Sequence, residues 1–253
     1  MRRAIGLLKA FTPEQPRRRM IELSHALGLN KTTVYRLLTA LESEGMVERD
    51  GEVYRLGPEL LALGARASGA ADLRAAAREE LEALAAEMRE TATLEMLVGR
   101  HMLILDEVRG HHVLGTLPWA GTRWPVHATS TGKVLLAELP PDVLEALLAE
   151  PLESFTARTI TDVAAFRREL ARVRQRGYAV SAEELESGFV AVGAPVRSAG
   201  GRVAAALSLG GPKVRLTPRR VEVFAEALVA AAGRTSDRLG YKPPRHAVRR
   251  AGP

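Results

Sequence analysis

The segment Ser130-Thr131-Gly132-Lys133 has residue types and a spacing that occur in enzymes. A serine three residues before a lysine is the nucleophile-and-base pattern of penicillin-recognising enzymes. Those enzymes also need a Ser-Asp-Asn and a Lys-Thr-Gly element, and the chain contains neither tripeptide. The Gly-Lys pair also resembles part of a phosphate-binding loop, but the preceding glycine would fall at His127, and Val134 replaces the residue that would hold Mg²⁺. The segment therefore predicts neither acyl-enzyme nor nucleotide chemistry.

Ligand binding is the better interpretation of this segment. Ser130 is expected to cap a helix with Lys133 in its first turn, and backbone N–H groups at a helix start can receive a ligand carboxylate. Two tryptophans bracket a glycine-containing loop just before this helix. If they are not ordinary core residues, they form part of the apolar wall of an effector pocket, which we expect to consist of Leu114, Leu117, Trp119 and Trp124.

Metal and thiol chemistry is not favoured. The chain has no cysteine, and the spacing of its six histidines suggests no metal site. The absence of cysteine excludes a disulfide framework, Cys-ligated zinc, iron–sulfur centres and thiol nucleophiles. His111 and His112 are adjacent and would point to opposite faces of a strand, while His101 and His127 add no helical pair. Zinc sites need three or four converging ligands, so we expect no metal and no cofactor. Without a carboxylate pair or a His-centred triad, an enzyme is not expected.

Charge is unevenly distributed along the chain. Residues 1–57 hold 10 basic and 7 acidic side chains, residues 58–241 hold 22 and 23, and residues 242–253 hold 4 and 0. A basic segment beside a neutral body predicts a small anion-binding module joined to a domain with another task. The length of 253 residues fits one large or two ordinary domains. No signal peptide or membrane-spanning stretch is predicted, so we expect a cytoplasmic protein without membrane contact.

Three helices and a hairpin are predicted within residues 1–57. Apolar periodicity indicates helices over 4–11 and 20–27, and Asn30 and Gly45 are good start and stop residues for a third. An Asp-Gly pair at 50–51 lies between two short β-favouring runs, which is a hairpin signal. This order of elements is typical of a winged helix-turn-helix DNA-binding domain.

The third predicted helix has one apolar and one polar face. Val34, Leu37, Leu38 and Leu41 recur at helical spacing and form the apolar stripe. The opposite face carries no carboxylate and can therefore approach phosphates. In a helix-turn-helix, the first residues of this helix meet base edges in the major groove, so we expect DNA contacts from Lys31, Thr32, Thr33, Tyr35 and Arg36. The alternative is an ordinary polar surface on a small helical bundle.

The rest of the chain is predicted to hold a linker and a larger domain. Residues 58–72 are expected to form a linker helix, and residues 242–253 a disordered basic tail. Residues 73–241 are expected to contain a helix at 73–88, strands at 92–98, 101–108 and 113–117, helices at 132–139, 143–149 and 163–176, strands at 178–183, 190–196 and 202–209, and a helix at 219–239. This order favours the α+β class with a mixed or antiparallel sheet.

Several segments resemble a known family when they are taken together. Residues 28–38 are similar to its recognition helix, and residues 44–49 and 54–57 to its wing. In the larger domain the similar segments are 125–133, 176–180 with 183–184, 194–196 and 206–208. The family is the isocitrate-lyase-regulator (IclR) type of bacterial transcription factor, and the resemblance extends over nearly the whole chain.

The resemblance implies a homodimer or a dimer of dimers. Its N-terminal domain would bind double-stranded operator DNA, and its C-terminal domain, of GAF-like shape, would bind a small organic molecule. The family often has a small capping residue where this chain has three consecutive arginines. We expect phosphate contacts from these arginines, unless they are merely solvated, and from those of the wing: Arg17, Arg18, Arg19, Arg49 and Arg55.

The effector pocket departs from the family pattern. Members that bind short keto acids such as glyoxylate resemble this chain at Ser208, but they tend to carry Asp, Cys and Ser at Ser181, Ala191 and Gly210. Fewer polar partners favour a mono-acid larger than glyoxylate or pyruvate, because apolar burial yields roughly 25 cal/mol per Å². We expect its carboxylate to be held by Ser130, Thr131 and Ser208.

The predicted function is that of a ligand-responsive, sequence-specific DNA-binding transcription regulator. Two alternatives stay open at this stage. One is a small-molecule enzyme that uses the C-terminal α+β domain. The other is a DNA binder without ligand or sequence preference.

Overall fold

A computed structural model of the protein describes residues 1–12, 15–60, 63, 70–110 and 120–243. The chain divides into two compact units, Met1–Ala71 and Asp72–Pro253. Most of the expected linker helix and the expected tail from residue 244 onward lie outside the described residues. The strand predicted at 113–117 lies outside them as well.

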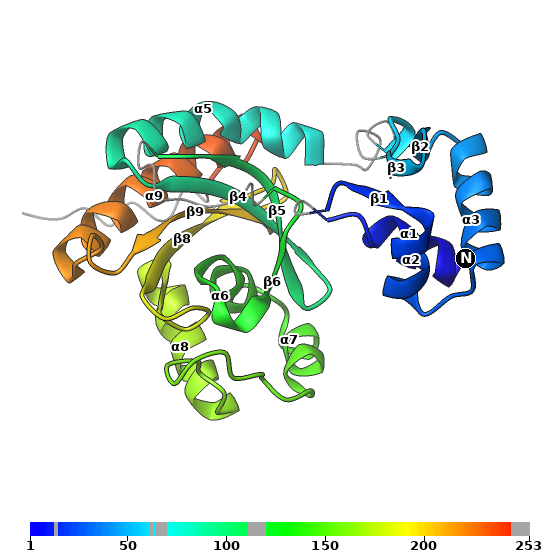
Figure 1. Ribbon diagram of the computed structural model, residues 1–253. Helices are drawn as coiled ribbons and strands as arrows, with labels where there is room; N and C mark the ends of the chain where they lie inside the picture. The colour runs from blue at the N-terminus through cyan, green and yellow to red at the C-terminus, as the bar shows by residue number, and fades with distance from the viewer. Residues whose placement is uncertain (13–14, 61–62, 64–69, 111–119, 244–253) are drawn as a thin grey trace, which may run out of the picture. The chain divides into compact units, whose positions relative to one another are not determined.

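The N-terminal unit contains the predicted three helices and hairpin (Figure 1): α1 Arg2–Lys9, α2 Met20–Leu27, α3 Lys31–Ser43, β2 Val47–Asp50 and β3 Val53–Leu56. Asn30 begins α3 as predicted, because its side chain accepts a hydrogen bond from the Thr33 amide at 2.8 Å. The apolar stripe of α3 packs into a core that includes Leu7 of α1 and Leu23 of α2. The winged helix-turn-helix arrangement is confirmed.

A third strand completes the wing, and sequence reasoning missed it. Residues Arg17–Arg19 form β1, which pairs antiparallel with β3, so the sheet order is β1-β3-β2. The register places Arg17 opposite Arg55 and Arg19 opposite Val53. Three arginines have no local preference for a strand, and the pairing partner lies far along the chain. The approach to α2 is therefore a sheet edge and not an irregular loop.

The C-terminal unit is built on one six-stranded antiparallel sheet of order β6-β5-β4-β9-β8-β7. Its elements are α5 Ala70–Met88, β4 Thr91–Val98, β5 His101–Val108, β6 Arg123–Pro125, the 3-10 turn η1 Val126–Ala128, α6 Ser130–Ala137, α7 Pro141–Leu148, α8 Val163–Arg176, β7 Ala179–Ala182, β8 Phe189–Arg197, β9 Val203–Pro212 and α9 Pro218–Arg238. These bounds confirm the α+β class. The short strand β6 was not predicted.

Helices cover both faces of this sheet (Figure 1). Helices α5 and α9 lie on one face, and α6 and α8 lie on the other. The first pair is tied together by ion pairs such as the one between Glu80 and Arg234, whose carboxylate and guanidinium approach to 2.6 Å. Beneath α6 and α8 lies an apolar core that includes Phe166 and Leu170. The candidate ligand site lies at the N-terminal end of α6, next to the sheet.

Candidate functional site: a DNA interface and a ligand pocket

The polar face of α3 is open to solvent in the N-terminal unit. Lys31, Thr32, Tyr35 and Arg36 are exposed and Thr33 is half-buried. On the opposite side, the core residues Val34, Leu38 and Leu41 are buried. The five residues expected to meet DNA therefore belong to the surface of the helix and are not needed for its packing.

The arginines of the wing are partly engaged within the unit. Arg55 pairs with Glu48 at 2.6 Å, and Arg17 lies 3.5 Å from Asp50. The Arg49 guanidinium donates to the Gly51 carbonyl at 2.8 Å and lies over the Tyr54 ring. These exposed contacts are weak and can be exchanged for phosphate.

Arg18 has a structural role that the sequence did not indicate. Its guanidinium donates to the Ala10 carbonyl at 3.0 Å, at the end of α1. Its neighbour Arg19 is exposed, and the Arg19 backbone N–H donates to Glu22 at 2.8 Å at the start of α2. Of the three consecutive arginines, Arg18 is thus the one whose side chain is half-buried and holds the end of α1.

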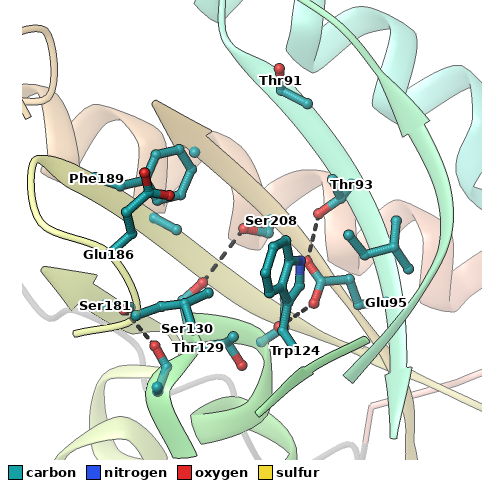
Figure 2. A pocket seen from close by; sticks show the side chains of 16 residues that line it. Thr91, Thr93, Glu95, Trp124, Thr129, Ser130, Ser181, Glu186, Phe189 and Ser208 are labelled. Atoms are coloured by element: carbon teal, nitrogen blue, oxygen red, sulfur yellow. Dashed lines mark hydrogen bonds between the residues drawn. The ribbon is translucent and has the colours of Figure 1, made fainter. Parts of the chain in front are cut away.

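In the C-terminal unit, a cavity of about 160 Å³ lies between the sheet and the start of α6 (Figure 2). Seven of the expected effector residues line it: Trp124, Ser130, Thr131, Ser181, Ala191, Ser208 and Gly210. The other lining residues are Thr91, Thr93, Glu95, Ile104, Ala128, Thr129, Leu185, Glu186 and Phe189. The remaining expected residues, Leu114, Leu117 and Trp119, lie outside the described part of the chain.

The strand register explains why residues from distant segments meet in this cavity. Ser181 of β7 pairs with Ala191 of β8, which pairs with Gly210 of β9, which pairs with Thr91 of β4. Paired residues of neighbouring strands point to the same face of a sheet. One row across four strands thus forms the cavity floor, and the parallel row through Ser208 and its partner Thr93 continues it.

Gly210 makes room for an aromatic ring. A Cβ atom at this position would lie 2.7 Å from Cζ of Phe189. The space that a serine would occupy is therefore taken by the Phe189 side chain, which lines the same cavity. The departure from the keto-acid pattern at this position exchanges a polar contact for an aromatic wall.

Thr129, and not Ser130, caps helix α6. The Thr129 side chain accepts a hydrogen bond from the Gly132 amide at 3.1 Å, and Ser130 is the first residue of the helix. The prediction of Ser130 as the cap was wrong by one residue, because either hydroxyl satisfies the sequence preference. Ser130 is consequently free to face Ser208 (Figure 2), and the two Oγ atoms lie 3.5 Å apart. This distance is long for a hydroxyl pair, so each hydroxyl can turn to a ligand oxygen that lies beside both of them.

The other predicted hydroxyls of the pocket already have acceptors. The Thr131 hydroxyl donates to Oε2 of Glu95 at 2.6 Å, and the Ser181 hydroxyl donates to the Ala128 carbonyl at 2.8 Å. The expectation that Thr131 helps to hold a ligand carboxylate is therefore not supported by its contacts. The available hydroxyl pair consists of Ser130 and Ser208.

Glu95 is a buried carboxyl of the pocket that sequence reasoning missed. It is 6% exposed, and Oε1 of its carboxyl accepts from the Thr93 hydroxyl at 2.8 Å. Burial raises the pKa of Glu95, although the hydrogen bonds from Thr131 and Thr93 act in the opposite direction. The alternation of Thr91, Thr93 and Glu95 along β4 was a usable signal, but polar residues at period two are normally assigned to solvent.

The hydrogen bonds of the Lys133 side chain go to groups other than Ser130, so Lys133 is not placed to act as a base for this serine. Its ammonium group is buried, donates to the Val180 carbonyl at 3.0 Å and forms an ion pair with Glu184. Burial lowers the pKa of Lys133 and raises the pKa of Glu184, while their mutual attraction opposes both shifts. The pair joins α6 to the loop after β7. Lys133 is thus a structural residue of the helix that presents Ser130.

A winged helix-turn-helix on one unit and a mostly apolar pocket with a few polar groups on the other define a ligand-binding transcription regulator. Comparison with known families agrees with this class. Residues 1–51 match the IclR helix-turn-helix domain, and residues 65–237 match the bacterial transcriptional regulator IclR C-terminal domain. The chain belongs to the IclR family.

Characterised relatives extend over nearly the same length. The chain is 34% identical over 242 residues to the HTH-type transcriptional regulator XynR of Escherichia coli, covering 94% of this chain and 96% of that one. It is 33% identical over 235 residues to BhcR of Paracoccus denitrificans, covering 92% and 84%. These relatives are transcription regulators, and the present chain is a DNA-binding transcription regulator with an effector domain and not an enzyme.

Solved structures show the same architecture. An IclR homologue from Microbacterium hydrocarbonoxydans, in complex with 4-hydroxybenzoate, superposes with a TM-score of 0.84 at 30% identity and covers 94% of this chain and 97% of that chain. The IclR protein of Thermotoga maritima superposes with a TM-score of 0.75 at 28% identity, covering 95% and 98%. None of the described helices combines the length and apolar character needed to cross a membrane.

Proposed function

We propose that this regulator binds an operator as a homodimer or dimer of dimers and that a small organic acid in the C-terminal pocket changes its operator affinity. A protein that binds chromosomal operators works beside the chromosome, so we also propose a cytoplasmic location. The observation that carries the choice of an acid is the buried Ser130–Ser208 pair at the start of α6, with Oγ atoms 3.5 Å apart.

The chemistry of this pair fits a carboxylate. Both hydroxyls can donate, and the N-terminus of α6 adds a partial positive charge on the same side of the cavity. Ser130 and Ser208 are 2% and 6% exposed, and the hydrogen bond between them is long, at 3.5 Å, so a ligand that supplies a closer acceptor is favoured.

The size of the cavity favours an acid larger than glyoxylate or pyruvate. A cavity of roughly 150 Å³ is large enough for benzene, and the cavity here is about 160 Å³. Ile104, Trp124 and Phe189 supply apolar walls against which a ring or a branched chain gains burial energy. The Microbacterium homologue, whose ligand is 4-hydroxybenzoate, supports a ring-sized acid.

The DNA side of the proposal rests on the exposed face of α3 and on the wing. Lys31, Thr32, Thr33, Tyr35 and Arg36 would read base edges. Arg17, Arg19, Arg49 and Arg55 would contact phosphates, whereas Arg18 would do so only by releasing the Ala10 carbonyl.

The experiment begins with DNA recovered together with the purified protein, which is sequenced to give a candidate operator. Fluorescence anisotropy then measures operator affinity with and without glyoxylate, pyruvate, branched acids and aromatic acids. We expect the larger acids to shift both the melting temperature and the operator affinity. The double variant S130A/S208A should lose both shifts and keep operator binding in the absence of acid.

Three results would contradict this proposal. Equal affinity for every duplex would indicate a non-specific binder. Stabilisation by glyoxylate or pyruvate alone would refute the size argument. An unchanged acid response in the double variant would show that the ligand carboxylate does not bind at the Ser130–Ser208 pair.

A further inference from the structure

The pocket has a second polar side, formed by Glu95 of β4 with Thr93 and Thr131. Each oxygen of the Glu95 carboxyl accepts one threonine hydroxyl, at 2.8 Å from Thr93 and at 2.6 Å from Thr131. Glu95, Ser130 and Ser208 line the same cavity. A ligand that fills the cavity can therefore contact the serines with one end and Glu95 with another.

No basic side chain lines the described cavity to neutralise this carboxyl. Its sixteen described lining residues include no lysine, arginine or histidine, and the second carboxylate, Glu186, is exposed. A buried carboxyl without a cationic partner is costly unless its acceptor sites are filled. A carboxylate offers about four acceptor sites, and two hydroxyls occupy only part of them. The structure thus leaves acceptor capacity at Glu95.

A hydroxyl group matches this capacity better than an ammonium group. Moving a neutral hydroxyl out of water costs less than moving a charged ammonium. A hydroxyl can donate to Glu95 when the carboxyl is ionised, and it can accept from Glu95 when the carboxyl is protonated. The apolar walls formed by Trp124, Ile104 and Phe189 reinforce the preference for a neutral group.

We propose that Glu95 is a specificity-determining residue that recognises a hydroxyl group of the effector. The effector is then a hydroxylated mono-acid of about the size of one ring, with its carboxylate at Ser130 and Ser208 and its hydroxyl at Glu95. This inference rests on the proposed acid effector and names its second functional group.

The first test uses the wild-type protein and matched ligands. Calorimetry compares benzoate with 3- and 4-hydroxybenzoate and with 3- and 4-fluorobenzoate, in which fluorine has nearly the size of a hydroxyl but cannot donate a hydrogen bond. We expect at least one hydroxybenzoate to bind about tenfold or more tightly than its fluorinated counterpart and than benzoate. Equal affinities within the series would overturn the assignment, as would tighter binding of 4-(aminomethyl)benzoate, which carries an ammonium group.

The second test substitutes Glu95 and measures whether the preference for hydroxybenzoate over benzoate changes. Glu95→Leu should bind benzoate and hydroxybenzoate with equal affinity, whereas Glu95→Gln should keep part of the preference because its amide oxygen still accepts. Glu186→Gln is the matched control: it removes the other pocket carboxylate, strengthens both acids alike and keeps their ratio. A full hydroxyl preference in Glu95→Leu would overturn the inference.

The two proposals fail in different ways. Suppose that benzoate and hydroxybenzoate bind the wild type equally and lose affinity together in S130A/S208A. The proposal of an acid effector is then supported, and the proposed role of Glu95 is refuted. If none of these acids binds the wild type, both proposals fall. Should Glu95→Leu not fold, the comparison of hydroxyl with fluorine in the wild type still decides the question.

Discussion

Individual side chains of this protein fall into two kinds. Arg36 has a role that follows from its position on one helix, because the apolar stripe of α3 leaves it on the opposite, exposed face. Glu95 has a role that depends on Thr131, which lies on another element and reaches its carboxyl at 2.6 Å. The first kind can be tested by removing a contact with DNA, and the second by changing a buried charge.

The substitution Arg36→Ala should abolish specific operator binding without unfolding the protein. The side chain is exposed, so its loss leaves the core of the N-terminal unit intact. One lost base contact costs about 1–3 kcal/mol per half-site, and a symmetric dimer loses roughly twice that amount. Anisotropy with operator and random duplexes measures the change. Arg168→Ala, an exposed arginine of the other unit, is the control, and an unchanged operator affinity of Arg36→Ala would refute the assigned face.

The substitution Glu95→Gln should stabilise the C-terminal unit increasingly as pH rises. Burial raises the pKa of Glu95, so folding favours the protonated carboxyl; this stability is present at low pH and is lost as pH rises through the folded-state pKa. Glutamine is neutral throughout. Melting temperatures should therefore coincide near about pH 4, where free glutamate is largely protonated. At about pH 8 the variant should melt about 2–4 °C higher. A difference that grows toward low pH would contradict the assignment.

At the scale of elements, helix α6 is the part of the fold that links the pocket to the core. Its first turn presents Ser130 to the cavity, its cap is Thr129, and Lys133 ties it to Glu184 beyond β7. The helix packs so closely on the turn before it that only glycine fits at position 132. A Cβ atom there would lie 1.8 Å from the Val126 carbonyl oxygen.

Two glycine-to-alanine substitutions should have opposite effects for this reason. Gly132→Ala should destabilise the C-terminal unit by about 1–3 kcal/mol through overpacking and should weaken acid binding by displacing Ser130. Gly233→Ala in α9 meets no atom within 4 Å of the new Cβ and should stabilise by about 1 kcal/mol through helix propensity. Chemical denaturation and calorimetry measure both effects. Similar stabilities of the two variants would show that α6 can shift away from the Val126 carbonyl.

At the scale of the whole molecule, the winged helix-turn-helix and the pocket lie in separate compact units, Met1–Ala71 and Asp72–Pro253. Net charge is distributed unevenly along the chain. Residues 1–57 hold 10 basic against 7 acidic side chains, residues 58–241 hold 22 against 23, and residues 242–253 hold 4 against 0. Residues 58–241 therefore add little electrostatic attraction for DNA, and two copies of the N-terminal unit are expected to supply most of the affinity.

Footprinting should accordingly reveal an inverted repeat. Its half-sites should lie about one helical turn, or a multiple of it, apart, because two identical recognition helices related by a two-fold axis must face the same side of the duplex. Protection should appear at both half-sites over the same concentration range in which sedimentation shows the dimer. Protection of a single half-site by a monomer would exclude this arrangement.

Effector and operator should affect one another by the same factor. If an acid lowers operator affinity, then operator DNA must lower the affinity for that acid equally, since binding free energies are reciprocal. Anisotropy gives the first factor, and calorimetry with and without operator gives the second. Unequal factors would mean that the acid acts at a further site or in an unrelated equilibrium.

The sequence by itself determined the elements that depend on neighbouring residues. The apolar spacing of Val34, Leu38 and Leu41 defined α3 and its exposed face, and Asn30 marked its start. The helices of the larger unit and its strands other than β6 followed from periodicity in the same way. Seven of the pocket residues were identified through the resemblance and the tryptophan-flanked loop.

Only the tertiary structure decided which side chains meet across distant segments. In the folded protein the arginines of β1 pair with β3, the Thr131 hydroxyl donates to Glu95, and the Phe189 ring occupies the space next to Gly210. Each of these contacts joins residues whose sequence separation carries no periodic signal. Strand register and helix packing set them, because both are chosen by the free energy of the whole core and not by local preference.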